Sequence, residues 1–166
     1  MGARVRVLTI CDREKDPLVA AGDDFLGRCR GRFAAERVST KSTRNKDLAT
    51  VKAKDSAWLL EKSEKTTRIA LDVGGRSYSS ERFSQKLVQW SDRGRPVAFL
   101  IGGPEGHTQA VVDAADETLT VSSMTLPHRL CYALLAEQVY RAQEIDRGGP
   151  YHTAGRPSGS ARCVGA

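Results

Sequence analysis

Two segments near the middle of the chain end in residue types that suit contact with a ligand. The apolar run 97–101 is followed by GGPEG at residues 102–106, and residues 121–128 read VSSMTLPH. Glycine has no Cβ, so a ligand can come close to the backbone, and turn-forming or polar residues present N–H and C=O groups to it. Two such loops at adjacent strand ends predict a ligand crevice.

The elements that must position these loops alternate between strand and helix patterns. A strand is expected at 5–9, and a helix with Phe25, Cys29 and Phe33 on one face follows it. A polar loop is expected at 39–46, and then a helix at 46–60 with Trp58 and Leu60 facing inward. In the second half of the chain, strands are expected at 69–73, where the strand stops at Gly74-Gly75, at 97–101 and at 119–121. Helices are expected from Ser79 or Ser80 to about 94, at 108–117 and at 128–146.

This order predicts an α/β fold with a mainly parallel sheet sandwiched by helices. Residues 1–152 are expected to form a single domain and residues 153–166 a disordered tail. No apolar stretch has the length of a membrane span, and no signal-peptide pattern precedes the first strand, so a soluble, cytoplasmic protein is expected. The four cysteines are scattered without a C-x-x-C pair, which indicates neither a metal site nor a disulfide framework.

The chain is basic, and its excess charge lies in the N-terminal part. The net charge is +6, and residues 1–66 hold 15 Lys/Arg against 10 Asp/Glu, whereas residues 67–166 hold 11 against 10. Residues 28–46 hold seven basic residues and one acid, which favours a polyanionic partner; an ordinary exposed basic loop fits equally well. The candidate phosphate-binding residues are Arg28, Arg30, Arg32, Lys41, Arg44, Lys46 and Arg129.

The common nucleotide and nucleophile motifs are absent. A dinucleotide fold needs G-x-G-x-x-G after the first strand, a P-loop needs G-x-x-x-x-G-K-[ST], and a serine nucleophile elbow needs G-x-S-x-G. None of these patterns occurs in the sequence. The glycine loops are therefore expected to bind a ligand of another class.

Five blocks of sequence, in order, resemble the RlmH family of ribosomal large-subunit pseudouridine N3-methyltransferases, which belongs to the SPOUT class. The blocks are LDVGG at 71–75, LIGGPEG at 100–106, SMTLPH at 123–128, AEQVYRA at 136–142 and PYH at 150–152. The resemblance is strong from residue 69 to residue 152 and weak before that. It implies a six-stranded parallel sheet with a C-terminal trefoil knot, a homodimer built largely through the last helix, and S-adenosylmethionine as cofactor. The cofactor-binding residues implied by the resemblance and the glycine loops are Leu71, Gly102, Gly103, Val121, Ser122, Ser123, Met124, Thr125 and Leu126.

The chemistry implied by the resemblance makes modest demands on the protein. S-adenosylmethionine is an activated methyl donor, so the protein must remove the N3 proton of pseudouridine, align that nitrogen with the methyl group and exclude water. The residues considered for substrate contact or proton handling are His128, Glu105, Tyr151 and His152. His128 could instead cap the last helix, and Glu105 the helix after its own loop.

In this family the substrate is ribosomal RNA in the assembled ribosome, and a second subunit completes the pocket. Arg129 and Arg141 could contact phosphate or cross the dimer interface, and His107 has no assigned role. The chain departs from the family where Thr153 stands in place of a basic residue, for which Arg156 could substitute. Two alternatives stay open, namely a knotted RNA-binding or ribosome-assembly module without turnover, and a SPOUT enzyme that methylates another base or a ribose.

Overall fold

The structure is a computed structural model that describes residues 4–11 and 14–153. The expected disordered tail therefore lies outside the described residues except for Thr153, and so does Arg156. Within the described ranges, no helix combines the length and apolar character needed to cross a bilayer. In the same ranges, no cluster of His, Cys, Asp and Glu side chains is placed to hold a metal ion.

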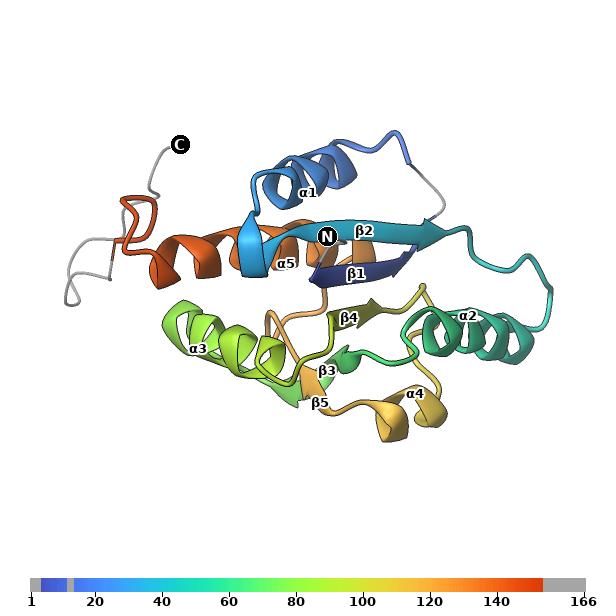
Figure 1. Ribbon diagram of the computed structural model, residues 1–166. Coiled ribbons are helices and arrows are strands. Elements are labelled where there is room, and N and C mark those ends of the chain that lie inside the picture. The colour runs from blue at the N-terminus through green and yellow to red at the C-terminus, as the bar shows by residue number, and fades with distance from the viewer. Residues whose placement is uncertain (1–3, 12–13, 154–166) are drawn as a thin grey trace.

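A single parallel sheet forms the centre of the fold (Figure 1). Its strands are β1 (Val5–Ile10), β2 (Ala35–Thr40), β3 (Thr67–Arg76), β4 (Val97–Ile101) and β5 (Glu117–Leu119), and they lie in the order β2-β1-β4-β3-β5. Every strand pairing is parallel, which confirms the predicted sheet type. The expectation of six strands is wrong for the described residues, which form five.

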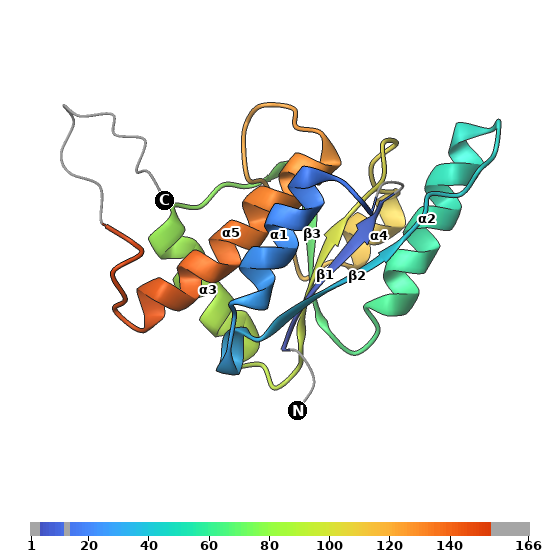
Figure 2. The same ribbon diagram turned by 90° about the horizontal axis from the view of Figure 1, so that it is seen from above.

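Helices cover both faces of the sheet. They are α1 (Pro17–Gly27), α2 (Leu48–Lys62), α3 (Ser80–Ser91), α4 (Gln109–Ala114) and α5 (His128–Asp146), with a short 3-10 turn at Gly31–Phe33. Figure 2 shows α1, α3 and α5 on one side of the sheet and α2 and α4 on the other. Because parallel strands need a crossover between them, α1, α2, α3 and α4 each connect the carboxyl end of one strand to the amino end of the next, and α5 follows the last strand.

The central strand β4 buries both of its faces, as a doubly covered sheet requires. On β4, Val97 and Phe99 point into the core beneath α1, α3 and α5, whereas Ala98 and Leu100 point into the smaller core beneath α2 and α4. Every residue of β4 is at most 3% exposed. The continuous apolar run in the sequence therefore marks the central strand.

Local capping explains where two helices begin. The Asp16 carboxylate accepts a hydrogen bond from Leu18 N at 2.9 Å, and Pro17 occupies the first helical position of α1. Ser79 caps α3 through Arg82 N at 3.1 Å, which agrees with the predicted start. These caps supply acceptors for amide groups that have no partner inside the helix.

Several element boundaries differ from the sequence predictions. The first helix ends at Gly27, so Phe33 reaches the core from the 3-10 turn. The predicted strand at 69–73 continues through both glycines to Arg76, and the predicted helix at 108–117 is only the short α4. The strand expected at 119–121 is β5, which ends at Leu119.

The second helix presents a broader face to the core than the predicted one. Trp58 and Leu60 are half-buried and pack against the smaller core cluster, as predicted. The buried positions of α2 are Val51, Asp55, Ser56 and Leu59. Two polar side chains thus occupy the inner face of this helix, and only the apolar residues at either end of the face follow the usual pattern.

Candidate active site

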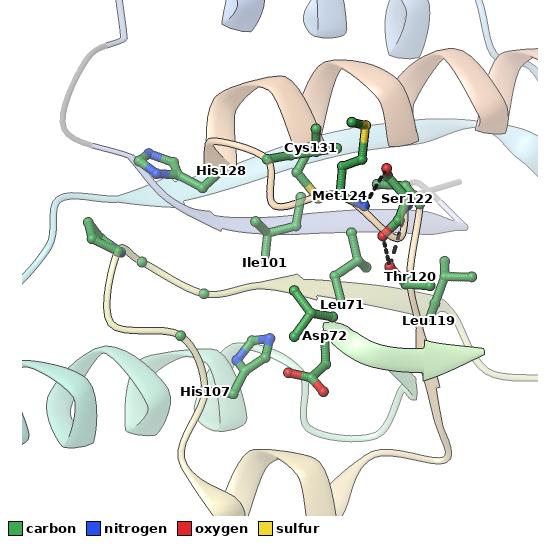
Figure 3. A pocket seen from close by; sticks show the side chains of 17 residues that line it. Leu71, Asp72, Ile101, His107, Leu119, Thr120, Ser122, Met124, His128 and Cys131 are labelled. Atoms are coloured by element: carbon green, nitrogen blue, oxygen red, sulfur yellow. Dashed lines mark hydrogen bonds between the residues drawn. The ribbon is translucent and has the colours of Figure 1, made fainter. Parts of the chain in front are cut away.

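A cavity of about 270 Å³ opens at the carboxyl ends of β3, β4 and β5 (Figure 3). Ligands bind at this edge in open α/β sheets because the loops that follow the strands converge there. The cavity is lined by Leu71, Asp72, Val73, Ile101, Gly102, Gly103, Pro104, Gly106, His107, Leu119, Thr120, Val121, Ser122, Met124, Leu126, His128 and Cys131. The lining therefore comes from the ends of three strands and from the first turn of α5.

The structure brings most of the predicted cofactor-binding residues together around this cavity. Those that line it are Leu71, Gly102, Gly103, Val121, Ser122, Met124 and Leu126. Ser123 and Thr125 do not line it, and both are exposed. From Ser122 to Leu126, alternate residues therefore line the cavity, and Ser123 and Thr125 between them do not.

The glycine loop after β4 is a tight turn. Gly106 N donates to Gly103 O at 3.0 Å, and Gly106 has a φ of 72°, a conformation that favours glycine. A Cβ on Gly102 would lie 3.1 Å from the carbonyl carbon and oxygen of Gly106, so the two sides of the turn are in close contact. Glycine at position 102 thus allows the turn to close beside the cavity.

The loop after β5 is held by its own hydroxyl groups. Thr120 Oγ1 donates to Ser122 O at 2.5 Å, and Ser122 Oγ accepts from Met124 N at 2.9 Å. The loop is also tied to β3 because Thr120 N donates to Arg76 O at 3.0 Å. These bonds hold the backbone of the loop after β5 in place at the cavity, which the glycine turn also lines.

The cavity is apolar with few ionisable groups. Among the described residues that line it, none is a lysine or an arginine, and the titratable groups are Asp72, His107, His128 and Cys131. A polyphosphate would need cationic or dense amide donors there. The lining instead suits a ligand with an apolar body and a few hydrogen-bonding groups.

Two ionisable residues of the cavity, Asp72 and His107, were not among the predicted site residues. Burial lowers the pKa of His107, and its Nε2 lies 3.1 Å from Leu100 O. The Asp72 carboxylate lies on the same side of the cavity as this imidazole (Figure 3). Asp72 lies near the end of the strand predicted at 69–73, and His107 directly follows the GGPEG loop, so both positions could have been identified from the sequence.

His128 is the predicted catalytic residue that the structure places at the cavity. It is the first residue of α5, and Pro127, which precedes it, provides no side-chain cap. Cys131 lies one turn further along, and burial raises the pKa of its thiol to about 11. Its thiol is therefore protonated at neutral pH, as expected for a structural cysteine.

Tyr151 and His152 do not reach the cavity of their own chain. They follow the far end of α5, where Tyr151 Oη donates to Glu137 Oε1 at 3.0 Å and His152 Nε2 lies 3.0 Å from Glu81 Oε1. Arg141 stacks over the Tyr151 ring at 4.8 Å and bonds Glu137. Burial and the Glu137 carboxylate both raise the pKa of Tyr151.

Glu105 and Arg129 occupy positions that limit their predicted roles. Glu105 is exposed in the glycine turn, and α4 begins after Thr108 without a side-chain cap. The alternative role of Glu105 as a helix cap is therefore not observed. Arg129 is partly buried, and its Nη1 lies 3.3 Å from Asp16 Oδ2, so it joins α5 to the start of α1.

The basic segment at 28–46 is divided by a strand. Residues 35–40 form β2, and the Arg28, Arg30 and Arg32 side chains precede it at the amino end of the sheet. Lys41, Arg44 and Lys46 follow β2 at the carboxyl end, where the cavity lies. A six-residue strand spans about 20 Å, so the segment is two separate groups instead of one continuous footprint.

The two groups also differ in their contacts. Arg28 pairs with Asp24 at 2.5 Å and lies over the Tyr140 ring at 5.8 Å. Arg30 donates to the Cys29 carbonyl at 2.8 Å. Lys41, Arg44 and Lys46 are exposed. The second group is the better placed for a polyanion that approaches the cavity.

Comparison with known proteins identifies the family. A family model described as "Predicted SPOUT methyltransferase" matches residues 3–152. The ribosomal RNA large subunit methyltransferase H of Acidiphilium cryptum is 37% identical over 158 residues, which cover 94% of this chain and 98% of that protein. The protein of the same name from Anaeromyxobacter sp. is 37% identical over 152 residues, which cover 90% of this chain and 99% of that protein.

A more distant solved structure gives a weaker likeness. The SpoU methyltransferase AviRb from Streptomyces viridochromogenes, in complex with AdoMet, matches 86% of this chain and 60% of its own with 15% identity and a TM-score of 0.45. That likeness is too low to carry an argument about the fold or the ligand of this chain. The sequence matches, which cover nearly the full length of the chain, confirm the predicted resemblance. The chain belongs to the SPOUT methyltransferase family, in the group of the ribosomal RNA large subunit methyltransferases H.

Proposed function

We propose that this protein transfers a methyl group from S-adenosylmethionine to N3 of a pseudouridine in large-subunit ribosomal RNA, within the assembled ribosome. The observation that carries the proposal is the cavity at the ends of β3, β4 and β5, which is lined by residues of three of the five blocks that resemble the RlmH family. The names of the full-length relatives agree with this activity.

The residues of the cavity fit S-adenosylmethionine. Leu71, Leu119 and Leu126 offer apolar surface to an adenosyl group, and the backbone of the loop after β5 offers N–H and C=O groups to adenine. The absence of lysine and arginine from the described lining also suits a ligand without phosphate. When bound, the cofactor supplies a methyl group on a sulfonium, which needs no further activation.

The protein's own residues then have three tasks. The glycine turn and the loop after β5 orient the donor, the cavity walls exclude water, and His128 lies where it can contact the base or accept its N3 proton. A target base inside folded RNA must leave its stack to reach such a cavity. The exposed Lys41, Arg44 and Lys46, on the same edge of the sheet, are placed to contact the phosphates around it.

We also propose that the protein works as a homodimer. Tyr151 and His152, proposed to act at the site, lie beyond the far end of α5 from His128, so a second chain must supply them to each cavity. Apolar residues remain exposed beside the cavity and on α5, namely Val73 at 75%, Met124 at 74% and Leu134 at 39%. A hollow of about 200 Å³ lies between α3, α5 and the end of β5 and includes Leu134.

The remaining expectations belong to the same proposal. The chain returns from β5, at one edge of the sheet, to α5 packed against α1 and α3, and this return supports the proposed trefoil knot. Residues 1–152 are proposed to form one domain, and the cytoplasm is proposed as the place of action.

Nucleoside mass spectrometry tests the proposed function. Purified protein and labelled S-adenosylmethionine are incubated with large subunits, whole ribosomes and free RNA from cells that lack the modification. N3-methylpseudouridine formed on ribosomes supports the proposal. A methylated ribose or another methylated base would replace the proposed target, and cofactor binding without methyl incorporation would indicate a non-catalytic module.

A further inference from the structure

Helix α2 buries two adjacent polar side chains under two different loops. Asp55 is 5% exposed and Ser56 is 2% exposed, although both stand on a helix whose other polar residues face water. Burying a carboxylate is unfavourable unless its hydrogen bonds are satisfied. Replacing a buried charged group by a well-packed apolar residue is often neutral or stabilising, so the contacts of Asp55 are informative.

Asp55 holds the loop that follows β2. Its Oδ2 accepts from Ser42 Oγ at 2.6 Å, and its Oδ1 accepts from Thr43 N at 2.9 Å. Ser42 and Thr43 are half-buried, whereas Lys41 and Arg44 on either side of them are exposed. The anchor therefore keeps the middle of the loop against α2 and leaves its cations in solvent. We call residues 41–46 the basic loop.

The same turn of α2 holds the glycine loop of the cavity. Ser56 Oγ accepts from Thr108 N at 3.1 Å, at the end of that loop. A Cβ added to Gly103 would lie 3.3 Å from Asp55 Oδ2, so the carboxylate is packed against the glycine turn. Figure 1 shows α2 between the chain that follows β2 and the chain that follows β4.

These contacts place a group of exposed cations at a fixed offset from the cavity. The Asp55 carboxylate is hydrogen-bonded to the basic loop and lies against Gly103, which lines the cavity. A polyanion held by Lys41, Arg44 and Lys46 would thus be aligned with the ligand in the cavity. Without the anchor, the same cations would sit on a loop free to move relative to the site.

We propose that Asp55 is a positioning residue for methyl transfer. It holds the basic loop against the glycine turn, so that the cations of this loop bind RNA phosphates at a set position relative to the cavity. Ser56 has the matching role for the end of the glycine loop. This inference rests on the proposed function. It concerns how the substrate is aligned, and it assigns Asp55 no contact with the reacting atoms.

The kinetic test compares Asp55→Ala with Glu61→Ala. Both variants remove one carboxylate from α2, and Glu61 is 68% exposed and pairs only with its neighbour Lys62 in the described contacts. We expect Asp55→Ala to raise the KM for ribosomal particles by about tenfold with little change in kcat, the pattern of lost substrate binding. The Kd for S-adenosylmethionine should stay within about twofold, and Glu61→Ala should match the wild type in both constants.

Limited trypsin digestion reports on the anchor without any activity measurement. Lys41, Arg44 and Lys46 are cleavage sites in the loop that Asp55 holds, so cleavage there should be faster in Asp55→Ala than in Glu61→Ala. Asp55→Asn should be intermediate in both cleavage and KM, because its amide oxygen can still accept from Thr43 N. Should Asp55→Ala fail to fold, Ser42→Ala removes the hydroxyl donor alone and should show the same direction of change.

Two results would overturn the inference. One is a loop cleavage rate in Asp55→Ala equal to that in Glu61→Ala, and the other is an unchanged KM for ribosomal particles. If the wild-type protein methylates no ribosomal particle, the proposed function fails separately. Co-sedimentation of the same variants with ribosomes then decides on Asp55, whose replacement should weaken that binding more than Glu61→Ala does.

Discussion

His128 and His152 are separated by the full length of α5. The helix has 19 residues, so about 28 Å lies between the cavity at its first turn and the Tyr151-His152 pair beyond its last. At the far end, His152 is held by Glu81 of α3 and Tyr151 by Glu137 of α5. A site that uses both histidines must therefore draw them from two chains.

Subunit mixing tests that requirement. We expect His128→Ala and Tyr151→Ala each to be strongly impaired alone. After equal amounts are mixed and allowed to exchange subunits, about half of the dimers are mixed, and each has one intact site of its two, so about a quarter of the wild-type activity should return. Methyl incorporation before and after exchange measures this. A mixture no more active than its components would show that the two residues act in the same chain or not at all.

Gly102→Val tests the cavity as the cofactor site. The new side chain would start 3.1 Å from the backbone of Gly106 and widen the glycine turn, so we expect calorimetry to show loss of S-adenosylmethionine binding in a folded dimer. Gly27→Val is the matched control, since no atom lies within 4 Å of a Cβ added there. Wild-type affinity in Gly102→Val would refute the assignment of the cavity.

The two glycines near the end of β3 should respond very differently to alanine. A Cβ on Gly75 would lie 2.5 Å from the carbonyl carbon of Leu119, a backbone atom of β5 that cannot move without breaking the pairing. We expect Gly75→Ala to lower the free energy of unfolding by about 3 kcal/mol, near the upper range for overpacking. Gly74→Ala meets only the Asp72 carboxylate at 3.3 Å and should cost less than about 1 kcal/mol. Urea denaturation of both variants measures the difference, and equal costs would contradict the close contact of β3 and β5.

His107 should make the stability of the protein depend on pH. Burial lowers the pKa of His107 below its ordinary value of 6.5, so the unfolded chain binds a proton more readily than the folded one. Stability then falls as the pH drops through about 6.5, and the fall levels off below the folded pKa. His107→Leu should flatten the free energy of unfolding between about pH 7.5 and pH 5.5. Identical slopes in the variant and the wild type would show that His107 is not the group responsible.

Periodicity was sufficient to predict most of the helices and the central strands. The run at 97–101 is apolar at every position because both faces of β4 are covered, and that pattern is visible without a structure. β2 was missed because none of its residues is fully buried and its charged residues, Glu36 and Arg37, resemble those of a loop. Arg37 is in fact held by Asp23 at 2.7 Å and by Glu14 at 2.9 Å, partners that are distant in sequence.

The part of the candidate site formed by loops at strand ends was predictable. The part that depends on side-chain contacts with segments distant in sequence was not. Loops that follow adjacent parallel strands must converge, so the cavity around Gly102 and Val121 could be expected. The burial of Asp55 could not, because a carboxylate among lysines on a helix is usually solvated. Its role depends on the path of the basic loop, which no local pattern specifies.

The position of α5 in the core has a consequence for biosynthesis. Tyr132, Leu135 and Val139 of this helix pack in the same cluster as Val5 and Val7 of the first strand. The core therefore cannot form until residues up to about 146 have left the translating ribosome. Until then, the apolar faces of the earlier strands are exposed to solvent. A protein proposed to modify finished ribosomes would thus acquire its fold only after α5 has emerged from the ribosome that makes it.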